Sequence, residues 1–176
     1  MTTWDAQTRE AIARLGRQVD VARASAVWAA AVDARSGQPP VWVHGDITGT
    51  NLLVRGGRLS AVIDFGCSAV GDPACDTTIA WTCFSGESRS LFKSQLPVDE
   101  ATWARGRGWA LWKVLLELVA DLSTPGQSER SATRFGWQQS PRQVVDDVIA
   151  DHRGESHPAE EPFGSAAAAR PKSTGS

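Results

Sequence analysis

The sequence has no tyrosine and only three histidines and three cysteines. Three imidazoles are too few to build the site of a multi-histidine metal hydrolase, so that class of enzyme is excluded. The cysteines are odd in number and form no C-x-x-C pair, which disfavours disulfide and zinc roles and predicts buried free thiols. The histidines are His44, His152 and His157, and the cysteines are Cys67, Cys75 and Cys83.

Long apolar runs are also missing. The most apolar stretch, residues 110–120, is interrupted by Lys113 and Glu117 and is too short to span a bilayer. The first residues contain no basic segment followed by an apolar run, so the sequence shows no secretory signal. We therefore expect a cytoplasmic protein without a membrane partner.

Basic residues are not in excess, since 18 Lys and Arg stand against 20 Asp and Glu. A nucleic-acid partner is not expected, because nucleic acids require a basic surface. Lysine is scarce: only Lys93, Lys113 and Lys172 occur, and all of them follow residue 92. The 176-residue length and the 41% hydrophobic content suit one globular domain.

The hydrophobic spacing predicts a protein that is mostly helical. Residues 5–35 are typical of two helices, which Asp5 and Asp20 can cap. Asp76, Asp99 and Ser140 can cap later helices. These later helices are expected over residues 76–84, 100–122 and 141–152, with another over 88–95. Residues 153–176 lack periodicity and predict a disordered tail, which leaves 1–152 as the folded domain.

Short β-type runs occupy the middle of the sequence. They cover residues 41–43, 52–54 and 59–63, and residues 66–74 are expected to form a loop. The last two runs are joined by a turn that contains Gly56 and Gly57, which predicts a β-hairpin. The fold class is therefore α+β, mostly helical, with a small hairpin.

Polar residues that suit phosphoryl transfer cluster around this hairpin. Asp46 and Asn51 lie in a glycine-containing loop before the first strand, and Asp64 ends the second strand. A hairpin brings the start of one strand beside the end of its partner, so Asn51 and Asp64 should lie close together. Their oxygens are ligands that Mg²⁺ prefers. Asp46 can then point at a hydroxyl near the metal, which suits a reaction governed by positioning and charge neutralisation.

Three short motifs follow one another in this region. They are His44-Gly45-Asp46-x-x-x-x-Asn51, Ile63-Asp64-Phe65-Gly66 and Gly71-Asp72-Pro73-Ala74-Cys75-Asp76. In order and spacing they resemble the aminoglycoside phosphotransferase (APH) family, which shares the protein-kinase-like fold. The resemblance extends less sharply to about residue 152 and covers what would be the C-terminal lobe of that fold.

The resemblance implies roles for six of these residues. Asp46 would be the catalytic base or hydroxyl-orienting residue. Asn51 and Asp64 would bind Mg²⁺ and, through it, the phosphates of ATP or GTP. Three further residues would support the loops structurally, namely His44, Asp72 and Asp76.

Two departures from protein kinases favour a small-molecule acceptor. Gly45 stands where protein kinases carry arginine, and Thr48 stands where they carry lysine. Aminoglycosides, sugars, amino alcohols and other antibiotics all suit the motif, so the acceptor stays open. Glu117 and Asp121 are candidates to attract a cationic acceptor, although an amphipathic helix would equally place them in solvent.

The nucleotide-covering N-terminal lobe of kinase-like enzymes is not recognisable in the sequence. Only residues 1–43 precede His44; they contain no lysine and are typical of helices rather than a sheet. We expect a truncated, weakly active phosphotransferase domain, with a partner chain that supplies the missing lobe as one possibility. The alternative is a non-catalytic fragment or interaction module.

Overall fold

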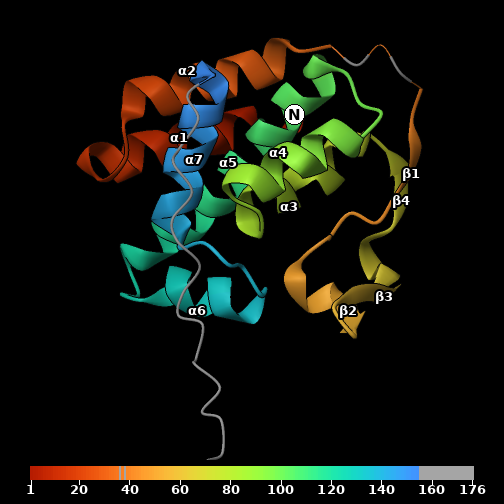
Figure 1. Ribbon diagram of the computed structural model, residues 1–176. Helices are drawn as coiled ribbons and strands as arrows, with labels where there is room; N and C mark the ends of the chain where they lie inside the picture. Colours follow the sequence, from red (N-terminus) through yellow and green to blue (C-terminus); the bar gives the residue numbers. More distant parts are fainter. Residues whose placement is uncertain (36, 38, 155–176) are drawn as a thin grey trace, which may run out of the picture.

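The computed structural model describes residues 1–35, 37 and 39–154. The disordered tail expected over 153–176 lies outside the described residues from 155 onward, and residues 153 and 154 extend the last helix and its cap. Figure 1 shows the helices grouped in one body, with the short strands together beside it. Among the described helices, none combines the length and apolarity that a membrane crossing requires.

The elements confirm the expected fold class, mostly helical with a small hairpin. The α-helices are α1 (Asp5–Leu15), α2 (Val21–Asp33), α3 (Ile79–Thr82), α4 (Gly86–Gln95), α5 (Glu100–Asp121), α6 (Gln127–Arg134) and α7 (Pro141–Arg153). The strands are β1 (Val41–Val43), β2 (Leu52–Arg55), β3 (Arg58–Val62) and β4 (Ala69–Gly71). Short 3₁₀ turns include η1 (Thr2–Trp4), η3 (Gly49–Asn51), η4 (Phe65–Cys67) and η5 (Pro73–Thr78).

Helix α5 forms the centre of the core. It packs against α1, α2, α6, α7 and η5. Leu111, Val114 and Leu115 recur at helical spacing and are fully buried, as the hydrophobic pattern predicts. Trp103 on the same helix stacks on Trp81 of α3, with ring centroids 4.7 Å apart. Burial of these large side chains against several elements holds the molecule together.

Two glycines allow neighbouring segments to approach α5 closely. A Cβ atom at Gly106 would overlap the hydroxyl of Thr77 in η5, and one at Gly108 would overlap the side chain of Ala31 in α2. Both segments therefore depend on a helix surface without side chains at these positions. The first approach matters for function, because η5 supports the polar loop that follows β1.

The expected helix caps are confirmed at three positions and wrong at two. Asp20, Asp99 and Ser140 accept hydrogen bonds from the first turns of α2, α5 and α7. Asp5 instead lies inside α1, where its carboxylate accepts hydrogen bonds from the indole of Trp28 (2.7 Å) and from Arg9.

The second wrong cap concerns η5. Asp72 is the capping residue there and accepts a hydrogen bond from the backbone N–H of Ala74 (3.1 Å). Asp76 lies inside the turn, so its carboxylate is available to the loop after β1. Asp72 and Asp76 both precede helical residues, and spacing alone does not decide which of two nearby aspartates caps.

The strands form two separate antiparallel pairs. β2 pairs with β3 as the expected hairpin, with Leu52 opposite Val62. β1 pairs with β4, with Trp42 opposite Val70. Strand β4 was expected to be part of a loop, because three residues are too few to show an alternating pattern.

Helix α6 was not expected, because its sequence is almost wholly polar and shows no apolar period. It is held by tertiary contacts instead. Ser128 in its first turn donates through its backbone N–H (2.8 Å) and its hydroxyl to the carboxylate of Asp121. Partial burial opposes ionisation of Asp121, but the Ser128 hydrogen bonds outweigh it and lower the pKa of that carboxyl. The carboxylate of Asp121 therefore binds the start of α6 rather than facing solvent.

Candidate active site

Asp76 anchors the polar loop that follows β1. The backbone N–H groups of His44 and Gly45 donate to its two carboxylate oxygens, at 2.7 and 2.8 Å. These are charge-assisted hydrogen bonds, which are stronger than neutral ones. The loop start is therefore bound to η5, which in turn packs on α5.

The ring of His44 connects the same loop to the end of the hairpin. Its Nε2 donates to the carbonyl oxygen of Ile63 (2.9 Å), and its Nδ1 accepts from the backbone N–H of Asp46 (3.3 Å). This pattern corresponds to the tautomer that carries its proton on Nε2. The ring also packs on Phe65, with centroids 4.8 Å apart. His44 therefore contacts both the Asp46 loop and the Asp64 loop and sets the distance between them.

Gly45 adopts a conformation that only glycine tolerates well. Its φ is +81°, and a Cβ atom at this position would overlap the backbone carbonyl oxygen of Cys67. The close approach explains why glycine stands here.

Asn51 connects the Asp46 loop to Ile63, the residue that precedes Asp64. Its side-chain Nδ2 donates to the carbonyl oxygen of Asp46 (2.9 Å), and its backbone carbonyl accepts from Ile63 N–H (3.0 Å). The first bond orients the amide so that its Oδ1 points away from the Asp46 backbone. The second places Asn51 beside the residue that precedes Asp64, as the hairpin argument predicts.

Asp64 adopts a left-handed backbone conformation, with φ 63° and ψ 62°. Among the described residues it is the one non-glycine residue with positive φ. Aspartate tolerates this region better than most residues, at a cost of about 1–2 kcal/mol for an ordinary side chain. Such conformations gather at functional sites, where they aim a side chain.

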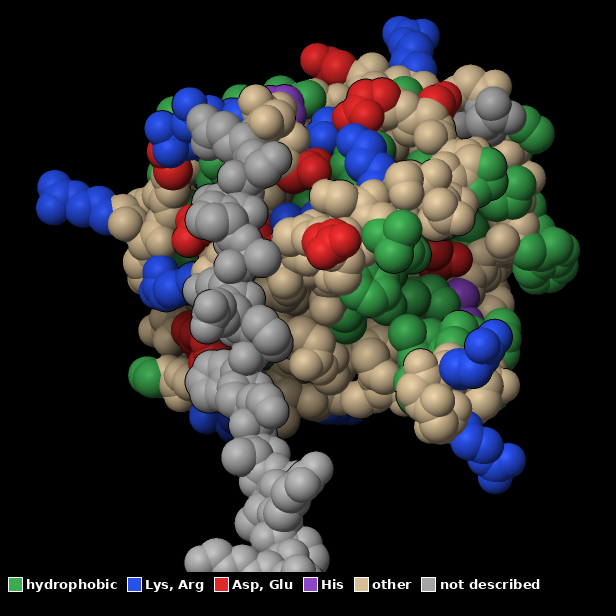
Figure 2. Space-filling model, in the orientation of Figure 1, with side chains coloured by type: hydrophobic (Ala, Val, Ile, Leu, Met, Phe, Trp, Pro, Cys, Tyr) green, Lys and Arg blue, Asp and Glu red, His purple; other side chains and the backbone are tan. Residues whose placement is uncertain are grey.

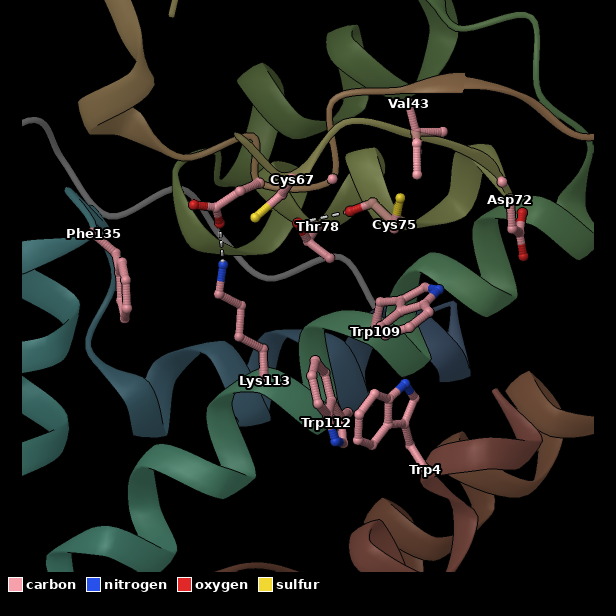
Figure 3. A pocket seen from close by; sticks show the side chains of 14 residues that line it. Trp4, Val43, Cys67, Asp72, Cys75, Thr78, Trp109, Trp112, Lys113 and Phe135 are labelled. Carbon is pink, nitrogen blue, oxygen red and sulfur yellow. Dashed lines mark hydrogen bonds and ion pairs between the residues drawn. The ribbon is translucent and has the colours of Figure 1, made fainter. Parts of the chain in front are cut away.

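Lys113 on α5 forms an ion pair with Asp46. Its Nζ lies 3.0 Å from Asp46 Oδ1, and the two side chains retain 24% and 31% of their exposure. The same ammonium lies 5.2 Å from the ring centroid of Phe135. Figure 3 shows the lysine reaching up from α5 to the carboxylate.

A cavity of about 560 Å³ opens beside this ion pair. Its floor is aromatic: Trp109 and Trp112 meet edge to face at 5.4 Å, and Trp4 stacks on Trp112 at 5.0 Å. Phe135 forms a further wall (Figure 3), and Asp46 is among the lining residues. The arrangement can place an organic molecule against the Asp46 carboxylate.

Asp72 also borders the cavity, and its charge is paired. Arg105 of α5 donates to its carboxylate through Nε (2.6 Å) and through a second nitrogen (3.0 Å). Arg105 is 4% exposed, so the bidentate pair is nearly buried on the arginine side. Asp72 therefore ties η5 to α5 and supports the loop scaffold.

A model of the phosphotransferase enzyme family, APH, matches residues 2–109, which include the three motifs. The chain belongs to this family. The match covers the Asp46, Asn51 and Asp64 loops and ends within α5, before Lys113.

Among solved structures, the chain is similar to a thermostable mutant of aminoglycoside phosphotransferase APH(4)-Ia in its apo form. The identity is 21% and the TM-score is 0.43. The similarity covers 74% of this chain and 45% of that protein, so the chain spans less than half of its length. No curated protein matches the chain significantly.

Two charged residues of the candidate site were not predicted from the sequence. Lys113 and Arg105 both lie on α5, far along the chain from the loops that they contact. A signal was present for Lys113, since it interrupts the most apolar stretch of the sequence. A charged residue on the buried side of a helix requires a partner, and here that partner is Asp46.

The cysteines near the site differ in exposure. All three are free, but Cys67 is exposed and the other two are half-buried, so the expectation of buried thiols is wrong for Cys67. Burial raises the pKa of the Cys75 thiol to about 12, and the carboxylates of Asp76 and Asp72 add to this effect. Cys75 therefore stays protonated at neutral pH and does not act as a nucleophile.

This difference predicts selective alkylation. In the native chain at about pH 8.5, iodoacetamide should modify Cys67 at least about a hundredfold faster than Cys75, because only thiolates react. Peptide mass spectrometry at timed intervals measures both rates. The difference should vanish in urea, and equal rates in the native chain would contradict the burial of Cys75.

Proposed function

We propose that this chain carries the catalytic loop of a phosphotransferase that moves the γ-phosphoryl group of ATP or GTP to a hydroxyl of a small molecule in the cytoplasm. One observation carries the proposal. Asn51 binds the Asp46 backbone through its side chain and binds Ile63, next to Asp64, through its own backbone. Family membership supports the reaction class.

Asp46 would act on the acceptor. Asp46 lines the cavity, where a bound hydroxyl can donate to its carboxylate. As the oxygen of that hydroxyl bonds to phosphorus and the bond to the nucleotide breaks, the proton passes to Asp46. Positioning of the hydroxyl is the larger contribution in this class of reaction.

Asn51 and Asp64 would hold Mg²⁺. An amide oxygen and a carboxylate are hard donors that suit this ion, which takes its remaining ligands from water and phosphate oxygens. When bound, Mg²⁺ neutralises the negative charge of the nucleotide phosphates. The described residues include no group of three or more His, Cys, Asp and Glu side chains that could hold a metal.

An exposed apolar face supports a contact with a nucleotide-covering lobe. Trp42 and Val70, which are cross-strand neighbours, are 80% and 59% exposed, and Phe65 is 62% exposed. Figure 2 shows hydrophobic side chains gathered on the side where Figure 1 places the strands. Apolar surface of this kind marks an interaction site. We propose that the lobe, in the same polypeptide or a partner chain, covers it.

A second candidate function is a non-catalytic interaction module. The Lys113 ion pair favours it, because Lys113 already neutralises the proposed catalytic carboxylate. The absence of lysine before residue 93 also favours it, since the phosphates would then need a lysine from elsewhere. Transfer of ³²P from ATP to a small molecule by the 176-residue chain would exclude this alternative.

Metal binding tests the proposed function directly. Mn²⁺ titrated into the chain without nucleotide should bind, and Asp64→Asn should weaken the binding at least about tenfold, because a charged oxygen ligand is lost. Electron paramagnetic resonance of free Mn²⁺ measures the affinity.

Two variants serve as controls for this titration. Asp146→Asn removes an exposed carboxylate of α7 and should leave the affinity unchanged. Asp46→Asn should change it by less than about twofold, since Asp46 is assigned to the acceptor and not to the metal. Equal affinities for the native chain and Asp64→Asn would overturn the metal assignment.

A further inference from the structure

We propose that the aromatic cavity beside Asp46 binds the acceptor, and that this acceptor is an uncharged hydroxyl compound with a ring-bearing apolar body rather than a polycation. The inference rests on the proposed function and names its substrate class. It assigns Lys113 as the residue that sets this specificity.

The size and lining of the cavity suit such a compound. Its volume of about 560 Å³ lies within the range of small-molecule sites, about 300–1,000 Å³. Trp112 lies between Trp4 and Trp109 in the aromatic floor, with its ring centroid 5.0 Å from that of Trp4 and 5.4 Å from that of Trp109. Flat apolar groups and the apolar faces of sugar rings pack well on indole surfaces.

The charges around the cavity disfavour a cation. Asp46 is paired with Lys113, and Asp72 is paired with Arg105 through two hydrogen bonds. An entering ammonium group would therefore meet the Lys113 ammonium and two carboxylates that are already neutralised. Like charges at short range repel each other, although the partial exposure of Lys113 weakens the effect.

The acidic residues that would attract a cation lie elsewhere. Asp121 accepts hydrogen bonds from Ser128 and holds α6 in place. Neither Asp121 nor Glu117 belongs to the cavity lining among the described residues.

The ion pair leaves room for a neutral hydroxyl. Lys113 holds Oδ1 of Asp46, so Oδ2 remains for a hydroxyl that donates to it. A neutral donor gains this bond without displacing the lysine, whereas a cationic acceptor must compete with it. Thr48, which stands where protein kinases carry lysine, is buried, and the ammonium beside Asp46 comes from Lys113 of α5.

The test compares three probes that differ in charge and in aromatic content. They are phenyl β-D-glucopyranoside, methyl β-D-glucopyranoside and kanamycin A, titrated into the 176-residue chain and followed by NMR. The phenyl glucoside should bind at least about tenfold more tightly than the methyl glucoside, because its ring packs on the indoles. It should also bind at least about tenfold more tightly than kanamycin A, because the cationic probe meets Lys113.

Lys113→Met tests the specificity assignment. The variant keeps the length of the stem and removes the charge, so Asp46 becomes unpaired. Kanamycin A affinity should rise at least about tenfold, while affinity for the phenyl glucoside should change less than about threefold. A gain of cation binding is not expected from simple loss of structure. Adding Asp46→Asn to this variant should abolish the gain.

Two tryptophan variants locate the binding. Trp109→Leu should weaken phenyl glucoside binding at least about tenfold, whereas Trp42→Leu, on the exposed strand β1, should leave it unchanged. The proposal is overturned if kanamycin A binds the native chain as tightly as the phenyl glucoside, if both glucosides bind equally, or if Lys113→Met leaves kanamycin affinity unchanged. These titrations need neither metal nor nucleotide, so their failure is distinguishable from failure of the proposed phosphotransferase function.

Discussion

Arg105→Leu is expected to lower the free energy of unfolding by about 3 kcal/mol, the lower end of the range for breaking a buried ion pair. Arg105 is 4% exposed and binds Asp72 through two nitrogens. Asp72 keeps 29% exposure, which is why the lower end applies. Removing the arginine leaves the carboxylate beside η5 without its cation. Urea denaturation followed by circular dichroism measures the change.

Two further variants separate this ion pair from general effects on packing. Asp72→Asn combined with Arg105→Leu should cost less than the sum of the single variants by at least about 1 kcal/mol, because both remove the same interaction. Arg9→Leu breaks an exposed pair with Asp5 and should cost less than about 0.5 kcal/mol. Strict additivity of the double variant would contradict the assigned coupling.

Gly45→Ala is expected to destabilise the chain by at least about 2 kcal/mol and to displace the Asp46 loop. A Cβ atom would occupy a left-handed position at φ +81° and would overlap the carbonyl oxygen of Cys67. The backbone must move to relieve the overlap. This movement would stretch the bonds that Asp76 makes to His44 and Gly45.

Gly57→Ala provides the matched control for this substitution. Gly57 also has positive φ, at +75°, but nothing lies within 4 Å of its Cβ position. Its substitution should cost only about 1 kcal/mol, from backbone conformation alone. The His44 ring resonances in NMR spectra should shift for Gly45→Ala and stay constant for Gly57→Ala. Equal stability losses in the two variants would contradict the steric assignment.

The hairpin and its polar residues could be predicted because they are local. Asn51 and Asp64 lie at the two ends of one hairpin, whose turn carries two glycines. Strand pairing then forces the backbone of Asn51 against Ile63, whatever the rest of the chain does. The long helix α5 could be predicted for the same reason, since its apolar period and the Asp99 cap are both contained in one stretch.

Prediction from the sequence failed where neighbouring residues carried no helical pattern, or where two residues could both act as the helix cap. Asp72 and Asp76 both precede helical residues, and only the packing of η5 on α5 decides that Asp72 caps and Asp76 binds the loop. Helix α6 has no apolar period and depends on Asp121. Such choices rest on contacts made after the elements have formed.

The sequence by itself determined the family and the mostly helical fold with its small hairpin, because these depend on residue types at short spacing. It also predicted roles for Asp46, Asn51 and Asp64. Only the tertiary structure decided the electrostatics of the site. Lys113 reaches Asp46 across 67 residues, and Arg105 reaches Asp72 across 33. Both basic residues lie on α5, whose orientation follows from the burial of its apolar faces. The charge state and aromatic floor of the cavity are therefore consequences of helix packing, which no local pattern encodes.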